Sequence, residues 1–169
     1  VSSDDSTVSG GVCNTISSNY GCNTISNGCC NTISSYCGRN TILNGCCNTI
    51  SGSYSRNSII SNGCCNTISA YDENTISNGR RNTISNYNNN TISNGNDNTI
   101  SSYSSTILNG NTNTVSNGYG LIGGGTNNTV SGYGSNILGG CCNINQDNFS
   151  IIGNGCRNTT DGCLTVIGG

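Results

Sequence analysis

A short motif, Asn-Thr-Ile-Ser or a close variant, recurs along the chain with its aliphatic residue at every seventh to ninth position. Each copy is too short for a helix, is rich in β-branched residues, and is bounded by the turn formers Gly, Asn or Ser. A short fixed period of this kind indicates a repeat architecture, in which each unit packs on its neighbours. The aliphatic positions are Ile16, Ile25, Ile33, Ile42, Ile50, Ile59, Ile68, Ile76, Ile84, Ile92, Ile100, Ile107, Val115, Ile122, Val130 and Ile137.

Two kinds of turn alternate strictly between the motifs. Asn-Gly or a Gly pair follows every even motif, and a tyrosine follows every odd one: Tyr20, Tyr36, Tyr54, Tyr71, Tyr87, Tyr103, Tyr119 and Tyr133. The true repeat is therefore two motifs long, and it shortens along the chain from 17 or 18 residues to about 14. A meander of hairpins joined by Asn-Gly turns is the alternative, but it gives no reason for the alternation. Stacked coils with one Tyr edge and one Gly edge explain it.

We predict an all-β fold, a β-solenoid or β-roll with two short parallel-stacked strands per coil. Each coil has 14–18 residues, and the chain forms about nine or ten coils. The expected single domain spans 1–169, with 1–12 as an N-terminal cap or frayed end, 13–140 as regular coils, and 141–169 as Cys-stapled C-terminal coils.

Alternation along each strand assigns an orientation to every motif position. Successive side chains of a strand point to opposite faces. If Ile points into the solenoid, the Asn two residues earlier also points in, and Thr and Ser point out. Buried amides need partners, so we expect Asn ladders that bond to backbone groups at the turns and to the next coil. This alignment puts Ile59 inside and gives Leu43, Ile60 and Leu108 the outward Ser position of the second strand.

The first strand of the coil carries an outward Thr-x-Ser pair in eight consecutive coils. The threonines are Thr15, Thr32, Thr49, Thr67, Thr83, Thr99, Thr114 and Thr129, and the serines two residues later are Ser17, Ser34, Ser51, Ser69, Ser85, Ser101, Ser116 and Ser131. Residues i and i+2 lie about 6.5–7 Å apart along a strand, and coils lie about 4.8 Å apart. A flat, uncharged, rigid hydroxyl array with these spacings can order water into a lattice that matches ice. We therefore predict ice or ordered water as the partner. The alternative is that small β-compatible residues simply suit a polar surface, but that need applies equally to both faces.

Two stretches carry a family resemblance. Asn113-Thr-Val-Ser-Asn-Gly and Asn128-Thr-Val-Ser-Gly resemble the half-repeat of ryegrass-type antifreeze, ice-recrystallisation-inhibiting β-roll proteins. The resemblance covers about residues 6–140 and implies an Asn-laddered roll with one flat ice-binding side. The part from Gly123 to Gly169 resembles the Gly-rich β-roll heads of trimeric autotransporter adhesins and large-virus fibre proteins. That second resemblance implies a structural fibre or adhesin subunit that self-associates.

Thirteen cysteines fall in columns one coil apart. Stacked positions about 4.8 Å apart suit the Cα separation of a disulfide, so we predict staples between coils; the alternative is free thiols that fill space. The candidates are Cys13, Cys30, Cys47, Cys65, Cys29, Cys46, Cys64, Cys141 and Cys156. Without His or a Cys-x-x-Cys spacing, we expect no metal site. We also expect Arg56 to pair with Glu73 between coils.

Composition excludes several classes of function. With no His, one Glu and 7% charged residues, the chain has no convergent acid–base set, and we expect neither enzymatic activity nor a cofactor. Five Arg and no Lys make nucleic acid an unsuitable partner, and no apolar run is long enough for a membrane span. Disulfides indicate an extracellular or surface-exposed protein. The Tyr edge should stack as a ladder, and it or the coil ends offer a surface for self-association or for carbohydrate.

Overall fold

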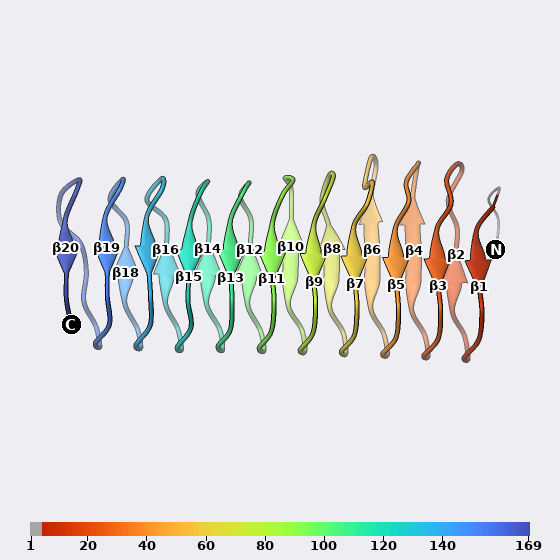
Figure 1. Cartoon of the computed structure of the whole chain (residues 1–169), viewed down its shortest axis with the longest axis horizontal. Helices are drawn as coiled ribbons and strands as arrows, with labels where there is room; N and C mark the ends of the chain where they lie inside the picture. The colour runs from red at the N-terminus through yellow and green to blue at the C-terminus, as the bar shows by residue number, and fades with distance from the viewer. Residues whose placement is uncertain (1–4) are drawn as a thin grey trace.

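The computed structural model describes residues 5–169 and is a β-solenoid of about ten turns, with about 16 residues in each turn (Figure 1). All strand pairs are parallel, and the described residues form strands and turns without a helix. The predicted fold class is confirmed. Tyr turns line one edge of the solenoid and Gly turns line the other, which we name the Tyr edge and the Gly edge.

The strands form two sheets. Sheet A has nine strands: β2 (Thr15–Ile16), β4 (Thr32–Ser35), β6 (Thr49–Gly52), β8 (Thr67–Ser69), β10 (Thr83–Ser85), β12 (Thr99–Ile100), β14 (Thr114–Val115), β16 (Thr129–Val130) and β18 (Ile144–Asn145). Sheet B has eleven: β1 (Thr7–Val8), β3 (Thr24–Ile25), β5 (Thr41–Ile42), β7 (Ile59–Ile60), β9 (Thr75–Ile76), β11 (Thr91–Ile92), β13 (Thr106–Ile107), β15 (Leu121–Ile122), β17 (Asn136–Ile137), β19 (Ile151–Ile152) and β20 (Val166–Ile167). One chain supplies both sheets and the core between them.

The core consists of one aliphatic side chain per strand. These Ile and Val residues are almost completely buried from Ile16 to Ile152, and Val8 and Ile167 close the two ends with partly buried side chains. In β18 the inward position is Asn145, whose Nδ2 donates to the carbonyl oxygens of Asn136 at 2.9 Å and Ser150 at 2.8 Å. Because each coil adds only two core side chains, the polar groups around them must also be satisfied.

Buried Asn ladders satisfy those polar groups, as predicted. Beside sheet A, the backbone N–H of Asn82 donates to Asn66 Oδ1 at 3.0 Å, and the backbone N–H of Asn98 donates to Asn82 Oδ1 at 3.1 Å. The Asn82 amide Nδ2 in turn donates to the carbonyl of Gly95 at 2.8 Å. The pattern repeats in this ladder, whose members are Asn14, Asn31, Asn48, Asn66, Asn82, Asn98, Asn113, Asn128, Asn143 and Asn158. Every buried side-chain nitrogen or oxygen in residues 5–169 has a hydrogen-bond partner.

Glycine at the Gly edge is required by the same contacts. Gly79 has a φ of +105°, and a Cβ there would lie 2.0 Å from the Gly95 carbonyl oxygen and 2.7 Å from Asn82 Nδ2. Equivalent clashes occur at Gly28, Gly45, Gly63, Gly95, Gly110, Gly125 and Gly140. The turns of the Gly edge are correspondingly uniform, whereas those of the Tyr edge vary in size (Figure 1).

One strand lies one residue out of the predicted alignment. In β7, Ile60 is fully buried, and Ile59 is 37% exposed and pairs with Thr41 and Thr75 in the outward column. The prediction that Ile59 points in and Ile60 points out is therefore wrong. Ser58 takes the ladder position because its backbone N–H donates to Asn40 Oδ1 at 3.0 Å, and Asn57 instead occupies a left-handed corner with φ of 57°.

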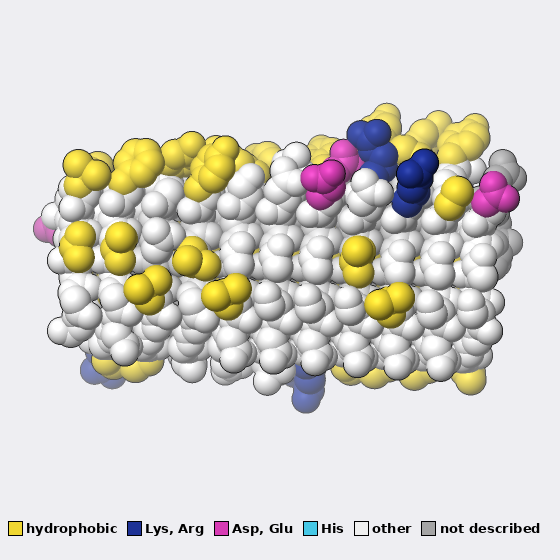
Figure 2. Space-filling model, in the orientation of Figure 1, with side chains coloured by type: hydrophobic (Ala, Val, Ile, Leu, Met, Phe, Trp, Pro, Cys, Tyr) yellow, Lys and Arg dark blue, Asp and Glu magenta, His cyan; other side chains and the backbone are white. Residues whose placement is uncertain are grey.

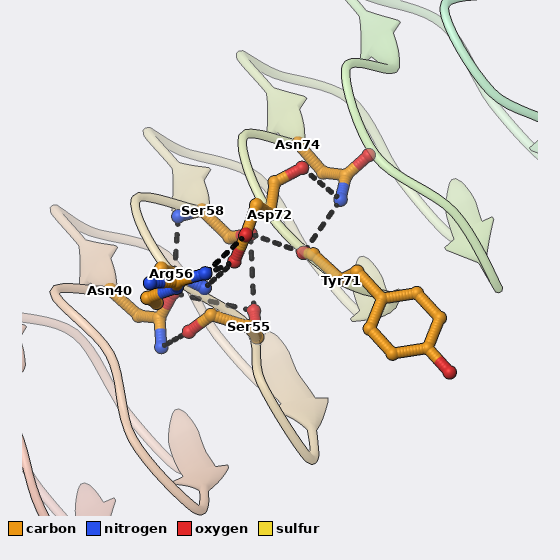
Figure 3. A network of polar contacts seen from close by, with 7 residues as sticks. All are labelled: Asn40, Ser55, Arg56, Ser58, Tyr71, Asp72 and Asn74. Atoms are coloured by element: carbon orange, nitrogen blue, oxygen red, sulfur yellow. Dashed lines mark hydrogen bonds and ion pairs between the residues drawn. The ribbon is translucent and has the colours of Figure 1, made fainter.

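The Tyr ladder exists but is interrupted. Edge-to-face contacts between rings of successive coils, at centroid distances of 5.4–6.1 Å, form two runs. The first run is Tyr20, Tyr36 and Tyr54, and the second is Tyr87, Tyr103, Tyr119, Tyr133 and Phe149. Among the described residues no ring contact links Tyr71 to either run. Its ring projects away from a polar network in the adjoining turn (Figure 3).

That network replaces a predicted ion pair. The Arg56 guanidinium contacts Asp72 at 3.0 Å, and Asp72 Oδ1 also accepts the Arg56 backbone N–H at 3.0 Å. Glu73, the expected partner, contributes only its backbone N–H, which donates to the Arg56 carbonyl oxygen. The expectation of an Arg56–Glu73 pair is wrong because Glu73 occupies a left-handed corner, and Asp72 stands directly beside Arg56 in the next coil.

Candidate functional site

The predicted Thr-x-Ser pairs lie together on the outer surface of sheet A. Their threonines form one column in strand register, in which Thr67 pairs with Thr49 and Thr83, and the column runs without interruption through eight strands. We name this surface, formed by the eight predicted threonines and the eight serines that follow them, the Thr-Ser surface. Ile144 continues the column in β18 and marks the end of the hydroxyl series.

The serines of the surface follow the strands less completely than predicted. Four of them lie in strands, where Ser34 pairs with Ser51 and Ser69 pairs with Ser85. The prediction that every serine belongs to a strand is wrong for the other four, which lie one residue beyond the ends of β2, β12, β14 and β16: Ser17, Ser101, Ser116 and Ser131.

One backbone hydrogen bond nevertheless keeps each of these four serines beside the next coil. The backbone N–H groups of Ser17, Ser101 and Ser116 each donate at 2.9 Å to the carbonyl of the aliphatic residue in the next coil. The Ser131 N–H donates in the same way to the Asn145 carbonyl at 2.8 Å. The serine column is therefore continuous in its backbone contacts, but the threonine column is the more regular of the two.

Packing fixes the threonines of the Thr-Ser surface more tightly than the serines. Thr15 is exposed, and the seven threonines that follow are half-buried by their stacked neighbours. Among the serines, the exposed ones are Ser17, Ser34, Ser69 and Ser116, and the half-buried ones are Ser51, Ser85, Ser101 and Ser131. A β-branched side chain on a strand has few χ1 rotamers, so the threonine hydroxyl and methyl groups repeat in nearly the same orientation from coil to coil. No charged residue belongs to the surface, which is a neutral array of hydroxyl and methyl groups.

The outer surface of sheet B is less regular. Figure 2 shows this face as mostly polar, with separate hydrophobic side chains scattered over it. Those in the Thr column are Ile59, Leu121, Ile151 and Val166, and those in the Ser column are Leu43, Leu108 and Leu138. Because both sheets have the same backbone repeat, the difference between their outer surfaces comes from side-chain choice and not from the demands of the fold.

The nine cysteines predicted as disulfide candidates lie in columns at the Gly edge. Cys29, Cys46 and Cys64 are joined coil to coil by parallel bridges, as are Cys141 and Cys156. All thirteen are free thiols in this structure, with Sγ atoms 2.8 Å apart for Cys141–Cys156 and 3.2 Å apart for Cys64–Cys65. The arrangement brings thiols of neighbouring coils together, and disulfide staples stay a prediction.

Charged residues continue these columns where Cys stops. Arg81 and Asp97 stack in adjacent coils with a bidentate contact, both N–O distances being 2.6 Å. The hydrogen bonds from Arg81 lower the pKa of the Asp97 carboxyl from its usual value. The side chains of Arg81 and Asp97 are 52% and 34% exposed, and a solvent-accessible pair of this kind contributes little to stability.

Other kinds of site are not formed by residues 5–169. They contain no cluster of three or more His, Cys, Asp or Glu side chains arranged to hold a metal ion. None of them belongs to a helix with the length and apolar character needed to cross a membrane. An open hollow at the Tyr edge is lined in part by Tyr20, Cys22, Cys37, Arg39 and Arg56.

Two features, one at the Tyr edge and one at the end of the threonine column, were not predicted from the sequence. Phe149 extends the Tyr ladder by one ring, at 5.6 Å from Tyr133. The sequence did contain a signal for this: Phe149 follows the irregular motif Asn143-Ile-Asn in the same way that a tyrosine follows each earlier odd motif. Ile144 replaces the outward threonine in that same motif, so the hydroxyl column ends where the Asn-Thr-Ile-Ser pattern ends.

No protein-family model matches the sequence, and none of the curated proteins compared with it matches either.

Proposed function

We propose that this protein is a non-enzymatic, extracellular ice-binding protein and that the Thr-Ser surface is its ice-binding site. The observation that carries the proposal is the unbroken, in-register column of eight threonines on sheet A, beside an equivalent sheet B column in which large apolar residues interrupt the threonines. If small hydroxyl residues served only as a polar coating, both columns would tolerate the same interruptions.

The chemistry of the surface supports this role. Each threonine offers a hydroxyl group to water and a methyl group beside it, and the backbone repeats this pair at about 4.8 Å between coils. The serine two residues later adds a second hydroxyl group, about 6.5–7 Å from the threonine where the strand is extended. The side chains lose little further conformational freedom on binding because the strands already hold them. A rigid surface can therefore order a layer of water without the entropic cost that a flexible surface carries.

The test replaces threonines in the centre of the surface. Thr67→Tyr and Thr83→Tyr place bulky side chains in the threonine column on the neighbouring strands β8 and β10. Each tyrosine prevents close approach of an ordered water layer. We expect thermal hysteresis and ice-crystal shaping to be largely lost, with the circular dichroism spectrum and melting temperature nearly unchanged.

Sheet B provides a matched control. Thr75→Tyr and Thr91→Tyr change the same residue type at the same motif position in the same coils, but on the opposite surface. These variants should keep full thermal hysteresis. Undiminished activity in the sheet A variants, or an equal loss in the sheet B variants, would contradict the proposal.

A second candidate function is self-association as a structural fibre or adhesin subunit. The observation that favours it is the Tyr edge, where the eight tyrosines and Phe149 form a ridge of half-exposed rings along the molecule. Charged side chains interrupt the hydrophobic row at this edge (Figure 2). Sedimentation of the wild-type chain separates the two: a monomer that shapes ice supports the first function, and an ordered oligomer without ice activity supports the second.

A further inference from the structure

Four cysteines of two adjacent coils converge at the Gly edge. Cys46 and Cys64 are paired by a parallel bridge, and each is followed in sequence by a second thiol, Cys47 or Cys65. Bridged positions in parallel strands lie about 4.8 Å apart, within the Cα range of about 4.4–6.8 Å found in disulfides. All four thiols are at least partly accessible, so a small reagent can reach them.

The four thiols are not equivalent, because hydrogen bonds and nearby charges favour one thiolate. Hydrogen bonds from the thiols of Cys46 and Cys65 lower the pKa of Cys64, and the positive charges of Arg80 and Arg81 in the next coil lower it further. The same hydrogen bond raises the pKa of Cys46 to about 12, because its thiol is the donor. Cys64 therefore has a lowered pKa, whereas the pKa values of its two donors Cys46 and Cys65 are raised.

We propose that Cys64 is the nucleophile of a thiol–disulfide exchange site that takes a small disulfide as substrate, and that Cys46 is the resolving thiol. The Cys64 thiolate attacks one sulfur of the disulfide RSSR, forming a mixed disulfide and releasing one RS⁻. Cys46 then loses its proton to solvent and attacks the Cys64 sulfur, which forms the Cys46–Cys64 bond and releases the second RS⁻. Two protein thiols are oxidised, and one external disulfide is reduced to two thiols.

Cys65 is the competing partner, since its Sγ lies 3.2 Å from that of Cys64. The two residues are adjacent in the chain, and Cys65 occupies a left-handed corner with φ of 59°. A bond between adjacent residues would have to distort that corner, whose backbone N–H donates to the Cys46 carbonyl at 2.9 Å. The bond to Cys46 leaves the corner unchanged and joins two coils, so it is the expected product.

A second stacked pair in the same chain serves as an internal reference. Cys141 and Cys156 are bridged in the same way, and their Sγ atoms lie 2.8 Å apart. The hydrogen bond to Cys156 and burial raise the pKa of Cys141 to about 11, with no arginine contributing to the shift. Both pairs are thus stacked in adjacent coils, and the pair that contains Cys64 has Arg80 and Arg81 in the next coil.

The experiment follows oxidation of the fully reduced chain by oxidised glutathione at about pH 7.5, with alkylation of the remaining thiols at successive times and tryptic mass mapping. Cleavage at Arg39, Arg56 and Arg80 places Cys46 in peptide 40–56 and Cys64 in peptide 57–80, while Cys141 and Cys156 share peptide 82–157. A Cys46–Cys64 bond joins two peptides, whereas a Cys64–Cys65 bond stays within one. We expect the 40–56/57–80 product to appear before oxidation of peptide 82–157.

Three variants make the assignment specific. Cys64→Ser should abolish the joined product, and Cys65→Ser should retain it. In Arg80→Gln, trypsin cleaves after Arg81, so the joined product is 40–56/57–81. It should form about threefold more slowly for each unit by which the pKa of Cys64 rises, with the Cys141–Cys156 pair unaffected. The proposal is overturned if the joined product depends on Cys65, if Arg80→Gln leaves the rate unchanged, or if the Cys141–Cys156 pair oxidises first.

Discussion

At the scale of single residues, the left-handed corners are the least expected feature of the chain. One non-glycine residue with φ between 53° and 59° precedes the ladder Asn of each coil of sheet A: Cys13, Cys30, Cys47, Cys65, Arg81, Asp97, Thr112, Asn127, Cys142 and Arg157. Only Asn and Asp among these residue types are favoured in that conformation. The corner is imposed by its hydrogen bond to the preceding coil, as when the Thr112 N–H donates to the Asn96 carbonyl at 3.0 Å. Residue preferences therefore could not predict it.

Thr112 offers a test at this scale, because a β-branched residue is the most strained type in a left-handed corner. Thr112→Asn introduces the residue that the next coil has at Asn127. We expect stabilisation by about 1 kcal/mol, equivalent to a rise of about 2–4 °C in melting temperature. Thermal melts followed by circular dichroism measure it. Thr114→Asn, a change on the neighbouring strand, should give no such rise, and an unchanged or lower melting temperature for Thr112→Asn would contradict the strain argument.

At the scale of the coil, the Asn ladder and the Gly edge act as one unit. Gly79→Ala would push a methyl group against the Gly95 carbonyl and Asn82 Nδ2 while keeping a positive φ. We expect a loss of about 2–4 kcal/mol, from backbone strain together with a disrupted buried hydrogen bond. Gly124→Ala is the matched control, since a Cβ there meets no atom within 4 Å. Chemical denaturation of both variants measures the difference; equal stabilities would show that the edge tolerates a side chain.

Most of the coil could be predicted because turn chemistry and strand alternation agree in nearly every repeat. The alternation of Tyr and Gly turns predicted two sheets and two edges, and the position of Asn predicted the ladder. The exceptions are local ambiguities. Asn57-Ser58-Ile59-Ile60 fits the motif in two registers, and only the hydrogen bond to Asn40 selects the one observed. The turn of Tyr71 also contains the Arg56–Asp72 ion pair between coils, which spacing alone does not specify.

The Thr-Ser surface was placed correctly because it lies where the motif is most regular. The motif does not specify where each strand ends, however. Ser34 and Ser116 occupy the same motif position, yet only Ser34 lies within a strand. The strand continues past the aliphatic residue in β4, β6, β8 and β10 but ends at it in β2, β12, β14 and β16, although the Thr-x-Ser pair is the same in all eight coils.

At the scale of the whole molecule, each coil contacts mainly the coils before and after it. Such a stack should tolerate the loss of a complete repeat, because its stability is approximately a sum over coils and their interfaces. Deletion of residues 99–113 removes one coil and joins Asn98 to Thr114, which preserves the motif and both edges. We expect a folded protein with a modestly lower melting temperature and a length reduced by about 4.8 Å. Small-angle scattering and circular dichroism report these changes.

A half-coil deletion tests the same idea in the opposite direction. Removing residues 106–113 joins Ser105 to Thr114 and puts two Tyr turns in succession. Every later strand would then move to the other sheet, against the wrong edge. This variant should be poorly folded or aggregate. If both deletions behave alike, the alternation of edges does not control assembly.

The direct stacking of equivalent positions also explains why the chain is almost neutral. A charge placed in any outward column stands about 4.8 Å from the same column in the next coil, so like charges in succession would repel along the whole length of the molecule. Both ion pairs, Arg56–Asp72 and Arg81–Asp97, join residues of adjacent coils with opposite sign. A solenoid of this kind can therefore carry isolated or alternating charges but not a uniformly charged face, and its solubility has to come from hydroxyl and amide groups.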